Sequence, residues 1–296
     1  MAAVLGIDVG GTHIRAAVHD GSTLLRFDTR PVPDNYPALL AHISALREQA
    51  QQCAGEVTGI GIGLPGVVTE NGGSWIPNLS FLNGKPLATH IQDLAGVRPQ
   101  LANDAQMALL GELWTGAARG CSSAALLSLG TGIGGAYAIA SKVVRGAANS
   151  AGSFGWLAVD AHTSGGTEHG PLEHVASGRA LERLGAALDP PQSPFELVAA
   201  ARRGHPQAVA ALDELAARLG RASASLVSIL DPQVLLVSGG LSDAFDLLES
   251  GLHAQVQRLA SPSGRRVPIR RAALGDFAGV YGAIRAASQQ SDSCFL

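Results

Sequence analysis

The chain has 296 residues, of which 46% are hydrophobic, and its formal net charge at pH 7 is −3. This length fits two domains better than one. The apolar content excludes an intrinsically disordered chain, which would be poor in apolar residues and highly charged. The charge argues against a nucleic-acid surface, which needs clustered basic residues.

The cysteines and the opening residues indicate a cytoplasmic protein. Cys53, Cys121 and Cys294 are odd in number and widely spaced, so we expect neither a disulfide framework nor a metal cluster. The first residues lack the basic start and the long apolar run of a signal peptide. Only Lys85 and Lys142 are lysines, which excludes a phosphate loop of the Gly-Lys-Ser or Gly-Lys-Thr type.

The first half of the chain alternates strands and helices. Apolar runs bounded by turn residues predict strands, and apolar residues at helical spacing predict helices. We expect strands at 4–9, 14–19, 58–64 and 99–102, and helices at 37–53 and 105–117. The first two strands are predicted to form a hairpin around Gly10-Gly11-Thr12.

The second half begins with the same pattern as the first, which is a strand, a glycine-threonine turn and a second strand. Residues 120–141 carry no charge and are long enough to span a membrane, but their glycines indicate a strand, a turn and a second strand. We expect the two strands at 124–129 and 134–139, a further strand at 234–237, and helices at 207–229, 244–259 and 279–288. This alternation predicts an α/β fold. We place one lobe at 1–117, completed by the C-terminal helix 279–296, and the other at 118–278.

Three glycine-rich turns follow predicted strands: Gly10-Gly11-Thr12, Gly130-Thr131-Gly132 and Ser238-Gly239-Gly240. Glycine lets backbone N–H groups approach a ligand closely, and Thr12 and Thr131 add hydroxyl donors. An anionic phosphate is the ligand that such donors serve best. One such turn is as readily a tight turn without a ligand, but three together predict a phosphate site.

Asp8 precedes the first of these turns. A carboxylate beside phosphate-binding amides would repel the nucleotide unless a cation intervened. Mg²⁺ suits this position because it keeps several waters and binds one or two carboxylates together with phosphates. We therefore expect Asp8 to bind Mg²⁺ through water. The alternative is an aspartate that only stabilises its own turn.

Asn103 and Asp104 lie between a predicted strand and a predicted helix. Either residue type is favoured as a helix N-cap, which is the structural interpretation. The functional interpretation makes Asp104 a general base, because an alcohol that attacks a phosphoryl group needs a carboxylate to accept its proton. Asn103 would then fix a second hydroxyl of the same substrate with its amide donor and acceptor.

With these residues in place, nearly the whole sequence resembles the ROK family of sugar kinases, within the actin/hexokinase/Hsp70 superfamily. The matching segments of the first half are 6–12, 61–66, 77–79 and 103–105. Those of the second half are 129–135, 145–147, 151–152, Glu173 with 176–178, and 231–232.

The resemblance implies two actin-like (ribonuclease H-like) lobes with nucleotide and sugar in a cleft between them. It implies that the first lobe binds sugar and phosphate, that the second binds nucleotide, and that the second lobe forms a homodimer. Asp104 would be the catalytic base, acting with ATP and Mg²⁺ on the terminal (6-)hydroxyl of a hexose. The implied sugar ligands are Gly66, Asn78, Asn103 and Glu173. The implied nucleotide-binding residues are Gly10, Gly11, Thr12, Gly130, Thr131 and Gly132 at the phosphates, with Gly239 and Gly240 near the adenosine.

The sequence departs from the family pattern at the zinc knuckle. The three family cysteines fall on Ser164, Gly166 and Pro171, and the zinc-binding histidine falls on Trp156, so we expect no zinc site. His162, His169 and His174 with Glu168 offer a replacement metal site, but we favour a surface loop with solvated histidines.

The same departure changes the implied sugar pocket. A family glutamate is Ser153 here, and Trp156 replaces an imidazole by an indole, so hydrogen bonds are lost and an apolar stacking face is gained. Trp156 either stacks on the ligand or fills the core where the zinc module would be.

These observations predict an ATP-dependent hexose kinase with glucose as the default substrate. N-acetylmannosamine, N-acetylglucosamine and allose kinases are alternatives, the last because residues 12–15 and 275–277 are similar to stretches in allose kinases. A non-catalytic sugar sensor is the alternative of another class, which Asp104 disfavours. A repressor of the family would carry an N-terminal helix-turn-helix, and the chain opens at its first strand. Polyphosphate in place of ATP stays open. We expect no membrane and no nucleic-acid partner.

Overall fold

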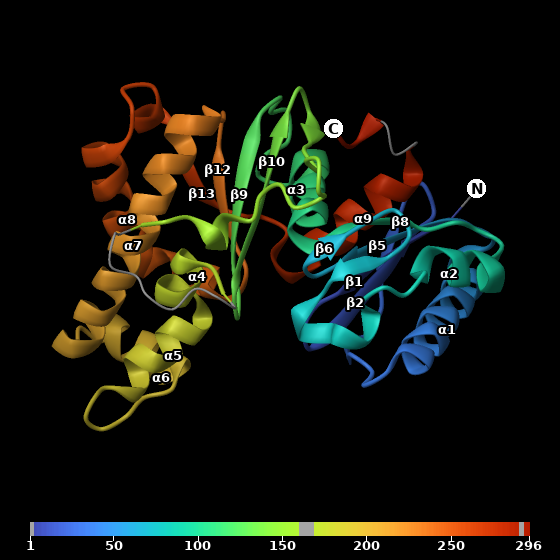
Figure 1. Ribbon diagram of the computed structural model, residues 1–296, viewed down its shortest axis with the longest axis horizontal. Coiled ribbons are helices and arrows are strands. Elements are labelled where there is room, and N and C mark those ends of the chain that lie inside the picture. Colours follow the sequence, from blue (N-terminus) through green and yellow to red (C-terminus); the bar gives the residue numbers. More distant parts are fainter. Residues whose placement is uncertain (1–2, 160–168, 290–292) are drawn as a thin grey trace. The chain divides into compact units, whose positions relative to one another are not determined.

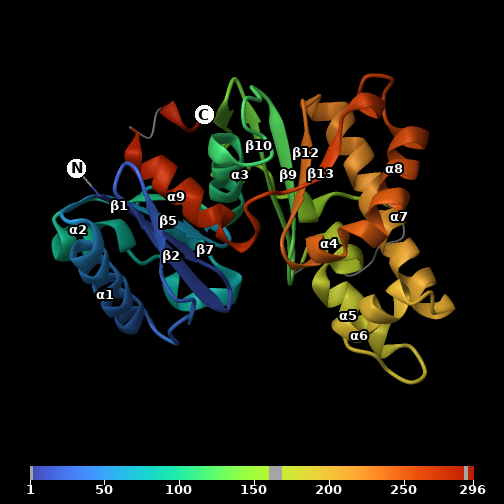
Figure 2. The same ribbon diagram turned by 180° about the vertical axis from the view of Figure 1, so that it is seen from behind.

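The structure is a computed structural model that describes residues 3–159, 169–289 and 293–296 (Figures 1 and 2). The chain forms two compact units. Unit 1 comprises Met1–Ser122, Ala138–Ala151 and Ala273–Leu296, and unit 2 comprises Ser123–Tyr137 and Gly152–Ala272. The two lobes expected from the sequence differ from these units chiefly in residues 138–151, which belong to unit 1. The binding roles expected for the lobes remain predictions.

Unit 1 is built on a mixed sheet with the order β3-β2-β1-β5-β8. The bounds of its strands are β1 (Ala3–Val9), β2 (His13–His19), β3 (Leu24–Arg26), β5 (Val57–Leu64) and β8 (Gln100–Asn103), and β4 (Arg30–Pro31) pairs with β2. β1 and β2 form the antiparallel hairpin that the sequence predicts, while β1, β5 and β8 run parallel. The carboxyl ends of these three strands therefore share one edge of the sheet.

Two pairs of helices cover the two faces of this sheet (Figures 1 and 2). Helices α1 (Tyr36–Ala54) and α2 (Leu87–Ala95) share a hydrophobic core with the strands. On the other face lie α3 (Asp104–Thr115) and α9 (Ala278–Ser288), which pack against each other.

Alternate glycines make the second face flat enough for these helices. Gly59, Gly61 and Gly63 occupy every second position of β5. A Cβ atom at Gly61 would lie 1.9 Å from the carbonyl oxygen of Ala283 in α9. Side chains at these positions would push the helix off the sheet, so the glycine excess of the sequence partly serves helix packing.

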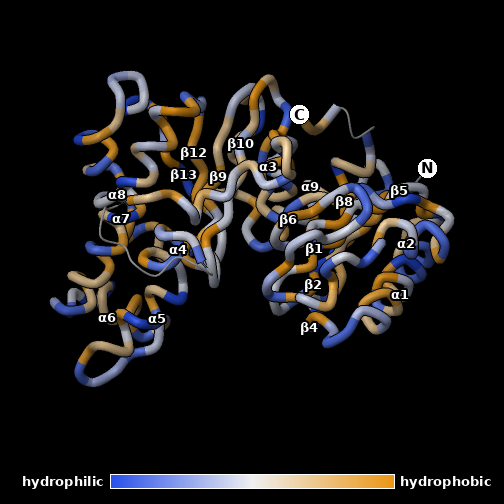
Figure 3. Tube along the Cα trace, viewed as in Figure 1, coloured by the Kyte–Doolittle hydropathy of each residue, from blue (hydrophilic) through white to orange (hydrophobic). Residues whose placement is uncertain are grey.

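Unit 2 contains most of a second sheet, whose order is β11-β10-β9-β12-β13. The bounds of the strands are β9 (Ala124–Leu129), β10 (Ile133–Ile139), β11 (Lys142–Val143), β12 (Leu235–Ser238) and β13 (Ile269–Arg271). β12 runs parallel to both β9 and β13 and is almost wholly apolar, as its orange tube in Figure 3 shows.

Among the described residues of unit 2, five α-helices accompany this sheet. They are α4 (Pro171–Ala176), α5 (Gly178–Ala186), α6 (Pro194–Arg202), α7 (Pro206–Leu230) and α8 (Phe245–Leu259). Leucines and alanines of the long helix α7 join the strands in one core. The expected long helices and central strands are confirmed to within about two residues, because their apolar patterns are long or bounded by glycine.

The sequence did not predict the shorter elements. These are α2, α4, α5, α6, β3, β4, β11, β13, the hairpin β6 (Val67–Val68) and β7 (Gly73–Trp75), and the 3-10 helices η1 (Pro77–Leu82), η2 (Phe154–Trp156), η3 (Gly240–Ala244), η4 (Gly264–Arg266) and η5 (Gly275–Phe277). Within the described ranges, no helix is both long enough and apolar enough to cross a bilayer.

Candidate active site

The shared edge of β1, β5 and β8 gathers most of the predicted residues of unit 1. Asp8 lies near the end of β1, Gly66 follows β5, and Asn103 ends β8 immediately before α3. Asp104 is the first residue of that helix. The carboxyl ends of parallel strands are where ligands bind in open α/β sheets, so this edge is the candidate site of unit 1.

Asp8 and Asp104 both lie beside Gly63. Asp8 pairs with Gly63 across the β1–β5 ladder. A Cβ atom at Gly63 would lie 3.1 Å from Asp8 Oδ1 and 3.6 Å from the Cα of Asp104. On its other side, a Cβ atom at Gly279 would lie 2.8 Å from Asp8 Cγ. Two glycines thus leave room for a carboxylate between a strand and the start of α9.

One carboxylate oxygen of Asp8 is free to bind a cation or a water molecule. Its Oδ1 is buried and has no hydrogen-bond partner in the protein. Burial, with a smaller contribution from the nearby Asp104, raises the pKa of Asp8 to about 7. A buried carboxylate oxygen without a partner is costly, so this atom calls for a cation or an ordered water.

Arg15 and Asp276 belong to the two stretches that resemble allose kinases, but the sequence did not indicate that they lie beside Asp8. Arg15 lies opposite Asp8 in the β1–β2 ladder, and its Nη2 donates to Asp276 Oδ2 at 2.9 Å. The Arg15 charge lowers the pKa of Asp8, whereas the Asp276 charge raises it. The register of the hairpin places Arg15 opposite Asp8, whereas Asp276 is 261 residues from Arg15 in sequence and nothing in the sequence linked the two.

Asn103 caps α3, as the structural interpretation expected. Its Oδ1 accepts from the N–H of Ala105 at 2.9 Å, and its Nδ2 donates to the carbonyl oxygen of Gly66 at 2.9 Å. The cap therefore ties the start of α3 to the loop after β5. The Asn103 side chain also makes a hydrogen bond that lowers the pKa of Asp104, so its two amide N–H groups serve Gly66 and Asp104.

Asp104 has the properties of a base that works near neutral pH. Burial raises its pKa to about 6, against the lowering effect of hydrogen bonds from the Ala105 N–H and from Asn103. The Ala105 N–H donates to Asp104 Oδ1 at 2.8 Å, which holds the carboxylate in place. A general base is most effective when its pKa lies close to the working pH.

The first glycine turn lies next to Asn78. The Gly10 N–H donates to the carbonyl oxygen of His13 at 2.9 Å, and Gly11 and Thr12 are exposed. A Cβ atom at Gly11 would lie 3.8 Å from the Asn78 side chain. Gly66 has a φ of +79° and sits against the Trp75 carbonyl, where a Cβ atom would lie 2.2 Å away. Only glycine fits at that position.

Unit 2 has its own group of predicted residues, at the turn between β9 and β10. The Gly130 N–H donates to the carbonyl oxygen of Gly132 at 3.0 Å, which closes the turn, and Thr131 is exposed. Gly239, which follows β12, has a φ of +81°, and a Cβ atom there would lie 2.5 Å from the carbonyl oxygen of Leu129. The two glycine turns of unit 2 are therefore neighbours.

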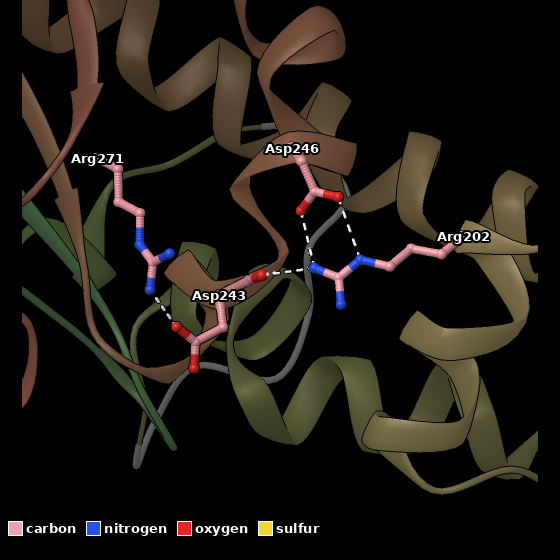
Figure 4. Close-up of polar contacts among 4 residues, drawn as sticks. All are labelled: Arg202, Asp243, Asp246 and Arg271. Carbon is pink, nitrogen blue, oxygen red and sulfur yellow. Dashed lines mark hydrogen bonds and ion pairs between the residues drawn. The ribbon is translucent and has the colours of Figure 1, made fainter.

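An arginine and aspartate cluster braces η3, which begins at Gly240 (Figure 4). Arg202 donates to both carboxylate oxygens of Asp246, at 2.9 and 3.1 Å, and to the carbonyl oxygen of Asp243 at 2.7 Å. Arg271 at the end of β13 pairs with the Asp243 carboxylate. These contacts fix the backbone that follows the Gly239-Gly240 turn.

Glu173, Ser153 and Trp156 also belong to unit 2 and lie around the Gly130–Gly132 turn. The Ile133 N–H donates to Glu173 Oε2 at 2.8 Å. A Cβ atom at Gly155, the middle residue of η2, would lie 2.6 Å from the carbonyl oxygen of Ile133. Ser153 immediately precedes η2, and Trp156 ends it. The expected sugar ligands thus divide between the units, with Gly66, Asn78, Asn103 and Asp104 in unit 1.

Two expectations about this region are corrected. Trp156 is 48% exposed, so the alternative that it fills the core is wrong. His174 lies in α4 and not in a loop. His169 precedes α4 with its side chain 42% exposed, as expected for a solvated loop residue, but it also contacts Glu173 and Arg179. His162, Ser164, Gly166 and Glu168 lie outside the described residues, and Pro171 begins α4.

The residues near Asp8 fit a magnesium ion that takes most of its ligands from water and phosphate better than they fit a metal whose ligands all come from the protein. The part of the chain that the structure describes contains no group of three or more histidine, cysteine, aspartate or glutamate side chains placed to hold a metal. Mg²⁺ needs only one or two carboxylates beside water and phosphate oxygens. The unpartnered Asp8 Oδ1 is the atom that fits such an ion.

Replacing Gly279 by alanine is expected to displace the Asp8 carboxylate. The new methyl group would meet Asp8 Cγ at 2.8 Å in a closely packed region, and overpacking of this kind costs about 1–3 kcal/mol of folding stability. The measurement is thermal unfolding together with sugar-dependent ATP turnover. A variant with unchanged stability and turnover would show that Asp8 has more room than the structure gives it.

Comparison with known proteins identifies the family of this chain. The model of the ROK family matches residues 4–290. The N-acetyl-D-glucosamine kinase of Escherichia coli O127:H6 is 32% identical, over 94% of this chain and 97% of that protein. The crystal structure of a ROK hexokinase from Thermus thermophilus is 31% identical and has a TM-score of 0.84, covering 98% of this chain and 99% of that one.

A second solved structure adds the ligands of a relative. The ROK family glucokinase from Streptomyces griseus, crystallised with glucose and AMPPNP, is 30% identical with a TM-score of 0.80, covering 97% of this chain and all of that one. These matches confirm the predicted α/β, actin-like fold class.

Proposed function

The chain belongs to the ROK family and is a sugar phosphotransferase, and from this premise we propose that it transfers the γ-phosphate of ATP to the terminal (6-)hydroxyl of a hexose or an N-acetylhexosamine. The observation that carries the proposal is the position of Asp104, a carboxylate on the first residue of α3 at the carboxyl edge of the unit 1 sheet, whose pKa burial raises to about 6. The N-acetyl-D-glucosamine kinase and the glucokinase named above are about equally identical in sequence to this chain, at 32% and 30%. Glucose and N-acetyl-D-glucosamine are therefore both first candidates for the substrate.

In the proposed reaction, the oxygen of the sugar hydroxyl attacks the γ-phosphorus of ATP while Asp104 accepts the proton of that hydroxyl. The bond from that phosphorus to the bridging oxygen breaks, and ADP leaves. Asn103 is proposed to contact a neighbouring sugar hydroxyl through its amide, and Gly66, Asn78, Ser153, Trp156 and Glu173 are proposed as further sugar contacts.

The glycine turns are proposed to hold the nucleotide. Backbone N–H groups and the hydroxyls of Thr12 and Thr131 would donate to phosphate oxygens, which develop charge during transfer. Gly239 and Gly240, on the backbone braced by Arg202 and Arg271, would lie near the adenosine. Asp8 would hold Mg²⁺ through water, and the ion would supply positive charge to the phosphates.

The first test is a coupled ADP-release assay with Mg-ATP against glucose, N-acetylglucosamine, N-acetylmannosamine and allose. Sugar-dependent turnover is expected with at least one of them. Absence of turnover, with one sugar still binding in calorimetry, would overturn the kinase and favour the sugar sensor that Ser153 and Trp156 suggest. Running the same assay with polyphosphate identifies the phosphoryl donor, and light scattering tests the proposed homodimer.

The value of kcat/KM for the sugar is expected to rise with pH between about 5 and 8. Asp104, with its pKa raised to about 6, must lose its proton before it can act as a base, and Asp8 ionises at about 7. Because the profile of kcat/KM reports the ionisations of the free enzyme, it should rise and then level off. A profile that is flat or falling over this range would contradict both assignments.

A further inference from the structure

The short helices α4 and α5 hold the Gly130–Gly132 turn through three contacts. The Gly178 N–H donates to the carbonyl oxygen of Gly130 at 2.9 Å, and the Arg179 N–H donates to that of Thr131 at 3.4 Å. The third contact is the Glu173 carboxylate, whose Oε2 accepts from the Ile133 N–H at 2.8 Å. A Cβ atom at Gly132 would lie 2.6 Å from the same oxygen, so the carboxylate rests directly on the turn.

The second oxygen of Glu173 faces His169. Arg179 Nη1 lies 3.2 Å from His169 Nε2, and His169 Nδ1 lies 3.3 Å from Glu173 Oε1. An arginine side chain has donors only, so His169 Nε2 must accept, and a neutral imidazole then carries its proton on Nδ1, toward Glu173. Arg179, His169 and Glu173 thus form a directed chain of contacts that ends at the Ile133 N–H.

This chain of contacts, from Arg179 through His169 to Glu173, resolves an electrostatic conflict at the turn. A lone carboxylate there would repel the phosphates that the turn is proposed to bind. The positive charge of Arg179, passed on through the polarised imidazole of His169, offsets the negative charge of Glu173. Glu173 can then order the turn without carrying an uncompensated charge.

We propose that His169 and Arg179 are positioning residues that fix Glu173 on the Gly130–Gly132 turn and so preset the turn for nucleotide phosphate. This inference rests on the proposed function for its ligand and on the observed contacts for its geometry. Neither residue needs to touch the reacting atoms, because both act through Glu173.

Arg179→Met removes the guanidinium and keeps the length of the side chain, and Arg179→Lys is the conservative variant. We expect Arg179→Met and His169→Ala to raise the KM for ATP and the Kd for AMPPNP by about tenfold, with kcat changed less than threefold, and Arg179→Lys to restore most of the affinity. A fall in kcat alone, or equal losses in the lysine and methionine variants, would overturn the positioning role.

Hydrogen exchange tests the inference without any activity. In Arg179→Met and His169→Ala, the amides of residues 131–134 should exchange at least about tenfold faster, while those of β1, in unit 1, keep their rates. Unchanged exchange at 131–134 would overturn the inference even if the protein is a kinase. Faster exchange in a protein without sugar-dependent turnover would uphold the contacts and reject the proposed function instead.

Discussion

Replacing Asp104 by asparagine is expected to lower kcat for sugar phosphorylation by about 100-fold to 10,000-fold, which is the usual contribution of a general base. Asparagine has nearly the same shape, and its amide oxygen can keep the hydrogen bond from the Ala105 N–H that Asp104 Oδ1 accepts at 2.8 Å. The change therefore removes the proton acceptor and leaves the start of α3 in place. The measurement is the coupled ADP-release assay at saturating sugar and ATP.

Calorimetry with the sugar gives the control for this variant. Binding should change little, because Asn103 and the loop after β5 keep their contacts. Asp93→Asn, at an exposed position of α2, is the matched substitution and should leave kcat unchanged. Turnover of Asp104→Asn within about tenfold of the parent protein would mean that another group accepts the proton.

Replacing Asp8 by asparagine is expected to stabilise the fold at pH 8 while abolishing most of the activity. Burial raises the pKa of Asp8 from 3.8 to about 7, so the folded state keeps a proton that the unfolded state releases. The free energy of unfolding of the parent protein must then fall as pH rises from about 4 to about 7. Asparagine lacks this ionisation, and we expect a gain on the order of 1–3 kcal/mol at pH 8.

The same variant should lose kcat/KM for ATP by about 100-fold, since it removes the negative charge that would hold Mg²⁺ at the phosphates. Denaturant unfolding at pH 5 and pH 8 measures the stability difference, which should be larger at pH 8. Asp20→Asn is the opposite case, because hydrogen bonds from the N–H groups of Thr23 and Ser22 lower the pKa of Asp20 to about 2. That variant should gain nothing at pH 8, and an Asp8→Asn protein less stable than its parent at pH 8 would contradict the assignment.

The sequence by itself determined the elements whose signals are local. The hairpin β1–β2, the strand β5 and the long helices α1 and α7 were predictable because glycines bound their apolar runs or because apolar residues recur at helical spacing over many residues. The glycine turns and the pair Asn103-Asp104 were visible for the same reason, since each follows a strand directly. The family resemblance depended on these same segments, and the comparisons confirmed it.

Only the tertiary structure showed which residues distant in sequence pack against these locally predicted elements. Gly59, Gly61 and Gly63 looked like part of an ordinary strand, but in the structure the first two make room for α9 and Gly63 makes room for the Asp8 carboxylate and α3. Asp276 reached Arg15 from the far end of the chain, and Trp156 proved to be half-exposed rather than buried.

The electrostatic environment of the site carboxylates is the most important feature that could not be predicted from the sequence. The raised pKa values of Asp8 and Asp104 come from burial and from groups distant in sequence, and the contacts of Arg179 with His169 and Glu173 depend on how α4 and α5 fold back on the turn. Residue type and spacing determine which groups are available, but the desolvation and the Coulomb interactions that tune them depend on distances that folding alone creates.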